Sequence, residues 1–443
     1  MPFRDAIRAV LQLVPDCKNI IIAYSGGVDS HVLMHVCSQI QNEHSSINFQ
    51  AVYIDHGLQL ESDDWRQHCE TVSNELSIPF AFVRVNALDV VGEGPEQAAR
   101  NARYSALKNL VNEATVLLTA QHEDDQAETL ILQLLRGCGV HGLAAMPKID
   151  DFSNGHIARP FLDISRQAIQ DYAAAYQLHW VEDPSNSDLN INRNYLRKEV
   201  IPILKKRWPA FSRTTARTAR YCGEAAELLD SQLAKYIDTK EPSILALMAV
   251  IPLKTPHQRA IIRHWLRLNG VKMPSSKIID ELKKNVIDAV AGKSPIIRWD
   301  NNEIRRFNNS LYLLDKLSSM PIDYAVEWLG DECELPSVLG KLLLSVSPSK
   351  GFSIDVWRSS KITVSFRRGG EKISLAGRGG SKTLKNLFNE NKIRPWARDR
   401  VPLIFINNKL AAVADLWCDE SFLAKENEPA CQIKWLHPEF RIQ

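Results

Sequence analysis

The run IIIAY-SGGVDS-HVLMHVCSQI, residues 20–40, decides the fold of this chain. Its apolar start at residues 20–24 is typical of a buried strand, and residues 31–40 follow a helical pattern. Between them lies a turn with two adjacent glycines. A strand that leads through a glycine-rich turn into a helix directs several backbone N–H groups, and the positive end of the helix dipole, towards one anion. The sequence therefore predicts a phosphate-binding loop.

The residues of this loop suit a phosphate in different ways. Gly26 and Gly27 allow the backbone angles and the close approach that a phosphate requires, because glycine has no Cβ atom. Hydroxyl groups at both ends of the loop can donate hydrogen bonds to phosphate oxygens. Asp29 would repel a phosphate, and a Mg²⁺ ion that bridges the two resolves this conflict. The predicted phosphate-binding residues are Ser25, Gly26, Gly27, Val28, Asp29 and Ser30, with Asp29 also a predicted Mg²⁺ ligand.

The loop differs from the common nucleotide-binding motifs. It lacks the lysine of a Walker loop and the GxGxxG spacing of a dinucleotide fold. An ordinary glycine-rich turn after a strand is the simplest alternative. However, the run at residues 25–30 resembles the SGGxDS loop of the ATP pyrophosphatases, the PP-loop family. This resemblance implies that the chain binds ATP and releases pyrophosphate during adenyl transfer.

The first 180 residues alternate apolar runs with amphipathic helical patterns. Strands that are apolar on both faces, separated by helices, indicate a parallel sheet covered on both sides. We therefore expect a doubly wound α/β domain, which for the PP-loop family means the adenine nucleotide alpha-hydrolase-like fold. The expected strands are residues 18–24, 49–55, 80–85 and 115–120, with helices that begin near residues 30, 62 and 96 and a further helix after residue 120.

A chain of 443 residues exceeds the usual size of one hydrophobic core, so several domains are expected. The predicted catalytic domain spans residues 1–211. Residues 212–340 are mainly helical in pattern, with one strand-like run at 303–314. Short apolar runs and glycine-rich turns predict a small α+β domain for residues 341–443.

A second candidate motif, AQHEDDQAET, follows the fourth expected strand at residues 120–129. Asp125 and Glu128 are three residues apart at the start of a helix, so both carboxylates project from one face. Such a pair can simply be an acidic first turn that the helix dipole favours. Beside the phosphate loop the pair is a candidate site for Mg²⁺, with Asp125 as ligand, and for an incoming amine. For His122 both a direct chemical role and a structural role remain open.

Further motifs resemble the tRNA(Ile)-lysidine synthetase family, in the order in which they occur in that family. Residues 122–129 are similar to its HxDDxxET element, and residues 136–146 to its RGxGxxGLxxM element. The resemblance continues through runs at residues 55–58, 159–162, 180–186, 193–197, 368–371 and 384–405. An ordered series over most of the chain is specific.

The resemblance implies a reaction on the wobble cytidine of an isoleucine tRNA with the anticodon CAU, and it implies that the middle and C-terminal domains bind this tRNA. ATP adenylates the C2 carbonyl oxygen with release of pyrophosphate, and the ε-amine of free L-lysine then replaces AMP. The product is lysidine, which changes codon reading from AUG to AUA. The residues that this reaction would use for catalysis are Asp29, Arg103, Asp125 and Glu128, with Mg²⁺ as the metal ion.

The formal net charge is only +2, but basic residues are concentrated in two stretches. Residues 190–220 contain nine Lys or Arg and one acid, and residues 378–400 contain seven and two. Solvated helix faces can have this bias, yet it also suits a nucleic-acid backbone. For Trp396, packing and base stacking both remain open. The predicted tRNA-binding residues are Arg100, Arg193, Arg197, Lys382, Lys385, Arg394, Arg398 and Arg400.

The eight cysteines include no CxxC pair, and the N-terminal residues lack the pattern of a secretory signal. No uncharged apolar run is long enough for a membrane span. We therefore expect a cytoplasmic protein that has no membrane partner and keeps its thiols reduced. The sequence leaves the oligomeric state open, with a homodimer among the options.

Three other functions remain as alternatives. tRNA thiolation uses the same loop but commonly needs reactive cysteines, which have no convincing spacing here. A small-molecule amide ligase of the same fold would need an ammonia source and would not need two basic stretches. An RNA-binding protein with a degenerate nucleotide fold would be expected to have lost the loop or the acidic pair, and both are intact.

Overall fold

The computed structural model describes the chain from residue 2 to residue 437 with some gaps. It forms two compact units, Met1–Gln232 and Leu233–Gln443. The sequence motif at residues 56–58 lies outside the described part, whereas all predicted site residues lie within it. The division into three domains stays a prediction. The described residues are 2–55, 62–85, 95–287, 295–321, 323–336, 339–347, 351–377, 379–426 and 428–437.

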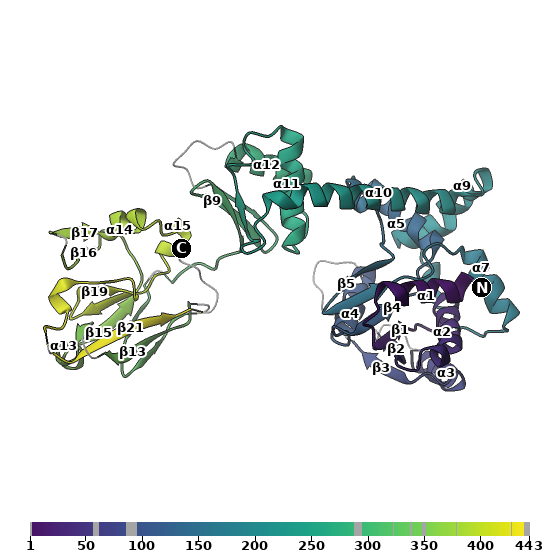
Figure 1. Ribbon diagram of the computed structural model, residues 1–443, viewed down its shortest axis with the longest axis horizontal. Helices are drawn as coiled ribbons and strands as arrows, with labels where there is room; N and C mark the ends of the chain where they lie inside the picture. The colour runs from purple at the N-terminus through teal and green to yellow at the C-terminus, as the bar shows by residue number, and fades with distance from the viewer. Residues whose placement is uncertain are drawn as a thin grey trace. The chain divides into compact units, whose positions relative to one another are not determined.

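The first unit is built on a six-stranded sheet with the order β3-β2-β1-β4-β6-β5 (Figure 1). Five strands are parallel, and β5 is antiparallel to its neighbour β6 at the edge. The chain runs outward from β1 to β3 and then returns to the other side of β1, so β1 and β4 flank the point where the strand order reverses. Ligands bind at this point in open α/β sheets. The strands are β1 Asn19–Ala23, β2 Asn48–Asp55, β3 Phe80–Arg84, β4 Thr115–Leu118, β5 Ile149–Phe152 and β6 Gly155–Ala158.

Helices cover both faces of this sheet, which confirms the expected doubly wound fold. Along β1, Ile20 and Ile22 pack into one core with α1, α2 and α7, whereas Ile21 packs into another with Leu107 of α4. The alternation explains why the strand is apolar at successive positions. The helices of the unit are α1 Pro2–Leu13, α2 Val28–Ile40, α3 Ser62–Glu75, α4 Pro95–Lys108, α5 Glu123–Leu135, α6 Val140–Leu143, α7 Arg166–Ala175, α8 Asn192–Tyr195, α9 Ile201–Arg207 and α10 Phe211–Leu233.

The second unit begins with helices that accompany a four-stranded antiparallel sheet of order β7-β10-β9-β8. The strand-like run at residues 303–314 is a hairpin, because Asn308 and Asn309 turn the chain with φ of 45° and 60°. Asparagine tolerates such angles, which a two-residue hairpin turn requires. The elements are β7 Ile244–Ala246, α11 Thr255–Leu268, α12 Ser276–Leu282, β8 Ile296–Trp299, β9 Asn302–Phe307 and β10 Ser310–Asp315.

The C-terminal part of the second unit consists mainly of short antiparallel strands around its own core, as expected for this region. Its sheets have the orders β11-β15-β18-β19-β20, β12-β13-β21-β14 and β16-β17. The strands are β11 Ala325–Glu327, β12 Glu332–Glu334, β13 Lys341–Ser347, β14 Phe352–Ser353, β15 Ile362–Ser365, β16 Lys372–Ser374, β17 Ser381–Thr383, β18 Leu403–Ile406, β19 Lys409–Val413, β20 Trp417–Cys418 and β21 Ala430–Leu436. The helices are α13 Ile354–Ser359, α14 Leu384–Glu390 and α15 Pro395–Arg398.

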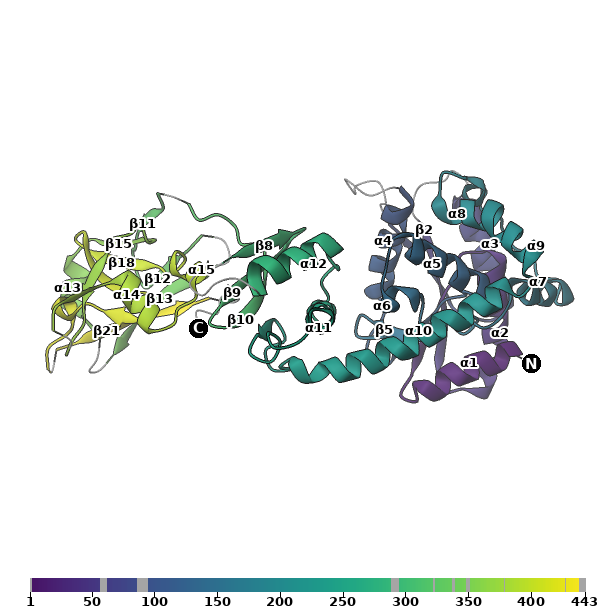
Figure 2. The same cartoon turned by 90° about the horizontal axis from the view of Figure 1, so that it is seen from above.

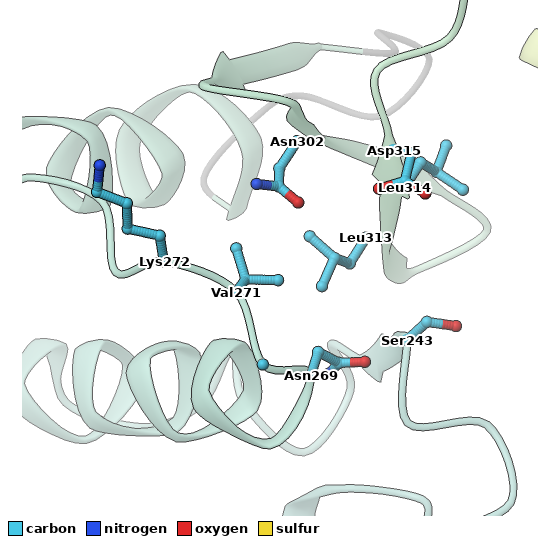
Figure 3. A pocket seen from close by; sticks show the side chains of 9 residues that line it. Ser243, Asn269, Val271, Lys272, Asn302, Leu313, Leu314 and Asp315 are labelled. Carbon is cyan, nitrogen blue, oxygen red and sulfur yellow. The ribbon is translucent and has the colours of Figure 1, made fainter. Parts of the chain in front are cut away.

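A hollow of about 390 Å³ lies between the loop after α11 and the strands β9 and β10. Val271 and Leu313 face each other across it, and the amino group of Lys272 points away (Figure 3). None of the predicted site residues lines this hollow. Among the described residues, no helix is both long and apolar enough to cross a membrane.

Candidate functional site

The phosphate loop follows β1 and adopts a shape that requires glycine at its second position. Gly26 has a φ of +79°, and a Cβ atom there would lie 3.0 Å from the Sγ atom of Cys69. The carbonyl oxygen of Gly26 accepts a hydrogen bond of 3.0 Å from the backbone N–H of Val181. The loop therefore lies against the buried thiol of Cys69 and is hydrogen-bonded to the backbone of Val181.

Hydrogen bonds inside the loop fix the start of α2. The Ser30 hydroxyl donates to the carbonyl oxygen of Gly27 at 3.0 Å and accepts from the backbone N–H of Ser25 at 3.2 Å. Gly27 is the residue before the helix, and no side chain caps the helix there. The N–H groups of the first turn of α2 are thus left without a side-chain acceptor, which suits an anion.

The second motif follows β4 and is organised by His122, which caps α5. The Nδ1 atom of His122 accepts a hydrogen bond of 3.2 Å from the backbone N–H of Asp124. In return the Asp125 carboxylate accepts one of 3.0 Å from the backbone N–H of His122. A ring nitrogen that accepts from an N–H group carries no proton, so this network assigns the hydrogen of the neutral imidazole to Nε2.

The Nε2 atom of His122 joins the two sequence motifs. It lies 3.7 Å from Oδ2 of Asp29 in the phosphate loop and 3.4 Å from Oδ2 of Asp125 in α5. The side chain of His122 is only 2% exposed, so the ring is held in this position. The structure thus brings Asp29 and Asp125 together across the switch point between β1 and β4, with the imidazole between them.

Asp29 keeps one buried oxygen atom without a hydrogen-bond partner. The side chain as a whole is 35% exposed, but its Oδ1 atom is buried and unpaired among the described residues. Burial raises the pKa of the Asp29 carboxyl, and the charge of Asp125 adds to the shift, whereas His122 and two arginines oppose it. A buried carboxylate oxygen without a partner indicates that a cation belongs beside it.

Two arginines contact the buried carboxylate of Glu128. Arg193 lies in α8, and Arg197 lies in the helical turn directly after α8. Arg197 makes a bidentate contact to Glu128 at 2.7 and 3.0 Å, and also donates to Asp125 at 2.9 Å. Arg193 places its Nε atom 3.1 Å from Glu128. Burial alone would lower the pKa of Arg197, but the hydrogen bonds and charge of Glu128 raise it above its ordinary value. Arg197 therefore stays cationic.

A further ion pair, which the sequence analysis missed, fixes α9 against the start of α5. The ammonium of Lys205 lies 2.8 Å from both carboxylate oxygens of Asp124. Burial would raise the pKa of Asp124, but the hydrogen bonds of Lys205 and Ser212 lower it overall. No sequence motif connects residues 81 positions apart, so only the tertiary fold reveals this pair.

The residues of the site fit a shared Mg²⁺ ion better than a metal centre made by the protein alone. Among the described side chains, no group of three or more His, Cys, Asp or Glu could hold a metal ion. Mg²⁺ is usually bound by one or two carboxylates together with substrate phosphates and water. Asp29, with its unpaired Oδ1 atom, and the nearby Asp125 match this donor set.

Other predicted residues lie outside this cluster of ion pairs or are engaged elsewhere. On α4, the guanidinium of Arg100 lies 4.9 Å from the ring centroid of Tyr104, and Arg103 is half-buried on the same helix. In the second unit, Lys382 pairs with Glu390 at 2.9 Å. Their predicted roles stay predictions.

Packing engages most of the predicted basic residues near α15. Arg394 is buried, with its guanidinium 4.6 Å from the ring centroid of Tyr312. Arg398 donates to the carbonyl oxygen of Ile393 at 2.9 Å, and Arg400 donates to that of Trp396 at 3.2 Å. Trp396 itself is 5% exposed, so its ring packs in the unit. By contrast, Lys385 is exposed.

Three family descriptions match this chain in order. Residues 4–204 match the PP-loop domain, residues 245–312 the TilS substrate binding domain, and residues 362–435 the TilS substrate C-terminal domain. The tRNA(Ile)-lysidine synthase of Coxiella burnetii is 41% identical over 93% of this chain and 92% of its own length. The enzymes of the same name from Methylococcus capsulatus and Photobacterium profundum are 36% and 35% identical, over 94% and 97% of this chain and 95% and 98% of their own lengths.

Proposed function

Since this chain belongs to the tRNA(Ile)-lysidine synthase family, we propose that it joins L-lysine to C2 of the wobble cytidine in an isoleucine tRNA with the anticodon CAU. ATP is consumed, and AMP and pyrophosphate are released. The observation that carries this proposal is the meeting of Asp29 and Asp125 around His122 at the switch point of the sheet. That meeting brings a phosphate loop and an acidic helix start into one site.

ATP binds with its phosphates on the loop at residues 25–30. The uncapped first turn of α2 supplies N–H donors, and the helix dipole favours the negative charge. The fixed shape of the loop, held by Ser30 and by the φ of Gly26, means that these donors need little reorganisation when the nucleotide binds.

In the first step, the C2 carbonyl oxygen of the cytidine attacks the α-phosphorus of ATP. A phosphorus–oxygen bond to the base forms, and the bond to pyrophosphate breaks. The step is necessary because a pyrimidine carbonyl oxygen is a poor leaving group and AMP is a good one. A Mg²⁺ ion held by Asp29 and Asp125 would neutralise phosphate charge. The unpaired Oδ1 atom of Asp29 supports this assignment.

In the second step, the ε-amine of lysine attacks C2, and the carbon–oxygen bond to AMP breaks. Free lysine has a pKa near 10.4, so its amine is mostly a protonated ammonium at neutral pH and must lose a proton to react. The carboxylates of Asp125 and Glu128 give the site the negative charge that attracts the ammonium, and Asp125, the more exposed of the two, accepts the proton. Arg193 and Arg197 already neutralise part of this charge, so the pair holds the cation without trapping it.

Exposed basic residues within each unit bind the tRNA backbone, with Lys385 as an example in the second unit. We further propose that the enzyme works in the cytoplasm, where ATP, free lysine and tRNA occur together. A homodimer would be compatible with this function but is not required by it.

The test measures pyrophosphate release and incorporation of labelled lysine with ATP, Mg²⁺ and unmodified isoleucine tRNA. We expect both signals to require the tRNA, and we expect a methionine tRNA to give neither. Pyrophosphate release without lysine incorporation would move the chain to another base modification. Absence of release with every tRNA would refute the assignment.

A further inference from the structure

The corner between α9 and α10, residues 208–210, lies near the acidic start of α5. Lys205, on α9, contacts both carboxylate oxygens of Asp124 at 2.8 Å. Ser212, at the start of α10, is 5% exposed and helps to lower the pKa of Asp124. Because Asp124 is the chain neighbour of Asp125, this contact places the corner close to the start of α5, where the acidic residues of the proposed site lie; Figure 2 shows how α9 leads into α10.

The corner presents an exposed tryptophan. Trp208 follows α9 directly, three residues after Lys205, and its side chain is 58% exposed. Its backbone is fixed, since its N–H donates to Leu204 at 2.7 Å and its carbonyl oxygen accepts from Phe211 at 2.9 Å. The guanidinium of Arg207 lies 5.8 Å from the centroid of the ring. A rigid backbone therefore presents a large apolar ring to solvent, with a cation beside it.

The charge around this tryptophan suits a polyanion. Of the nine basic residues between 190 and 220, three are turned inward to the carboxylates of α5. Arg220 alone of the remaining six has a described carboxylate within ion-pair distance, that of Glu224 at 3.7 Å. These six exposed residues are Lys198, Lys206, Arg207, Arg213, Arg217 and Arg220.

An aromatic ring among exposed cations is the combination that binds single-stranded nucleic acid. Cations follow the phosphates, while the ring stacks on a base that has no pairing partner. An apolar partner protein would instead favour a patch with few charges at its centre. A base-paired stem cannot offer a base for stacking, so the unpaired nucleotides of a tRNA loop are the matching ligand.

We propose that Trp208 stacks on an unpaired base of the anticodon loop next to the target cytidine, with Lys206 and Arg207 on the flanking phosphates. This inference rests on the proposed function and names a positioning contact for it. Stacking on a neighbouring base would fix the backbone of the loop while the target base enters the site. Trp208 would thereby act on tRNA binding and leave ATP binding unchanged.

The experiment compares three variants of the full chain with the wild type. Trp208→Ala removes the ring, Trp208→Phe keeps an aromatic face, and Tyr221→Ala is the matched control. Tyr221 is 55% exposed and has the guanidinium of Arg220 5.5 Å from its ring centroid, but it lies about 15 Å further along α10 at 1.5 Å rise per residue. Each protein is assayed for lysine incorporation and for binding of an anticodon stem-loop RNA, and thermal unfolding is recorded.

We expect Trp208→Ala to raise the KM for tRNA and the Kd for the stem-loop RNA about tenfold or more, as loss of a stacked base does. Trp208→Phe should recover most of this loss, and Tyr221→Ala should stay within about twofold of the wild type. The KM for ATP should not change, which a general folding defect would not allow.

Two results would overturn the inference: wild-type RNA affinity in Trp208→Ala, or an equal loss in Tyr221→Ala. The proposed function fails in a different way, because then even the wild type incorporates no lysine. Weaker stem-loop binding by Trp208→Ala alone would in that case still support the stacking contact.

Discussion

At position 122, the two nitrogens of one imidazole have different partners. Nδ1 accepts from the backbone of Asp124, and Nε2 faces Asp29 and Asp125. We expect His122→Asn to keep the helix cap, because asparagine is a good capping residue, but to lose the bridge between the carboxylates. Activity should fall about 10- to 100-fold, as it does when a group that orients a metal-binding side chain is removed. Steady-state assays of lysine incorporation measure this loss.

His122→Ala is the comparison variant, since it removes both the cap and the bridge. It should lose a similar amount of activity and in addition about 1 kcal/mol of folding free energy from the cap. Nitrogen NMR of the wild-type imidazole should show Nδ1 without a proton. A protonated Nδ1, or an active His122→Asn, would contradict the positioning role.

Asp29→Asn should separate activity from stability. Burial raises the pKa of the Asp29 carboxyl, so its ionised form is less favourable in the folded chain than in the unfolded chain. Removal of the charge should therefore leave the Tm at neutral pH unchanged or higher, while pyrophosphate release falls by about 10²–10³-fold. Thermal unfolding and the release assay give the two numbers.

The pH profile provides the control for Asp29. The pKa of Asp29 is higher in the folded chain than in the unfolded chain, so between these two pKa values the native state binds more protons. The free energy of unfolding therefore falls as the pH rises from the lower to the higher of the two values. The acidic limb of wild-type kcat/KM should accordingly lie above the ordinary aspartate pKa of about 3.9. Asp171→Asn, at an exposed position of α7, should change neither Tm nor rate. A lower Tm in Asp29→Asn would contradict the explanation.

The sequence predicted the types of residue in the site better than their partners. The spacing of Asp125 and Glu128, and that of Arg193 and Arg197, predicted a shared helix face for each pair. It could not show that the two faces meet, because this contact joins residues 69 to 72 positions apart. For the same reason the tRNA-phosphate role predicted for both arginines stays untested, while their described partners are carboxylates.

At the scale of elements, the pair between Lys205 and Asp124 holds α9 against α5. The Asp124 side chain is 13% exposed and that of Lys205 37%. Lys205→Met would leave a nearly buried carboxylate without its cationic partner. We expect the free energy of unfolding to fall by about 1–3 kcal/mol, less than for a fully buried pair because solvent reaches the lysine. Urea unfolding measures the change.

The double variant Lys205→Met with Asp124→Asn should recover much of this stability, whereas Lys198→Met, at an exposed position, should lose little. The pKa of Asp124 is lowered in the folded chain, so its contribution is present above the unfolded pKa and is lost as the pH falls through the folded pKa. The difference between wild type and Lys205→Met should therefore shrink in acid. A difference that persists there would point to packing alone.

Element types were predicted well where the pattern was long and periodic. The expected strand at residues 49–55 is β2, Asn48–Asp55, and the helix expected near residue 62 is α3, which begins at Ser62. The edge hairpin of β5 and β6 was missed, because neither IDDF nor GHIA is an apolar run like that of the equally short β4. The turn at Asn308 and Asn309 was also missed, because two asparagines between apolar runs are a weaker hairpin signal than Asn-Gly.

At the scale of the molecule, each compact unit has a core of its own. One large cluster of buried side chains lies within residues 3–173, and another within residues 328–435. A fragment of residues 1–236 should therefore unfold cooperatively and bind ATP with a Kd within about threefold of the full chain, yet modify no tRNA. Circular dichroism and calorimetric titration test these points.

The complementary fragment, residues 237–443, should fold without binding ATP. If residues 1–236 unfold gradually, the first unit depends on the second. The change in pattern at residue 211 coincides with the start of α10. Sequence periodicity cannot show which core a long helix such as α10 packs against. The predicted boundary at residue 211 is therefore tested by the folding of these fragments.

The thiol of Cys69, which lies against the phosphate loop, can report how often the loop opens in the first unit. Burial raises the pKa of Cys69 to about 12, and only a thiolate reacts with alkylating reagents at a useful rate. Because the thiol lies against Gly26, a reagent gains access only in molecules whose loop has lifted from its support. The rate at which Cys69 is alkylated thus measures how often the loop opens, and bound ATP should lower this rate.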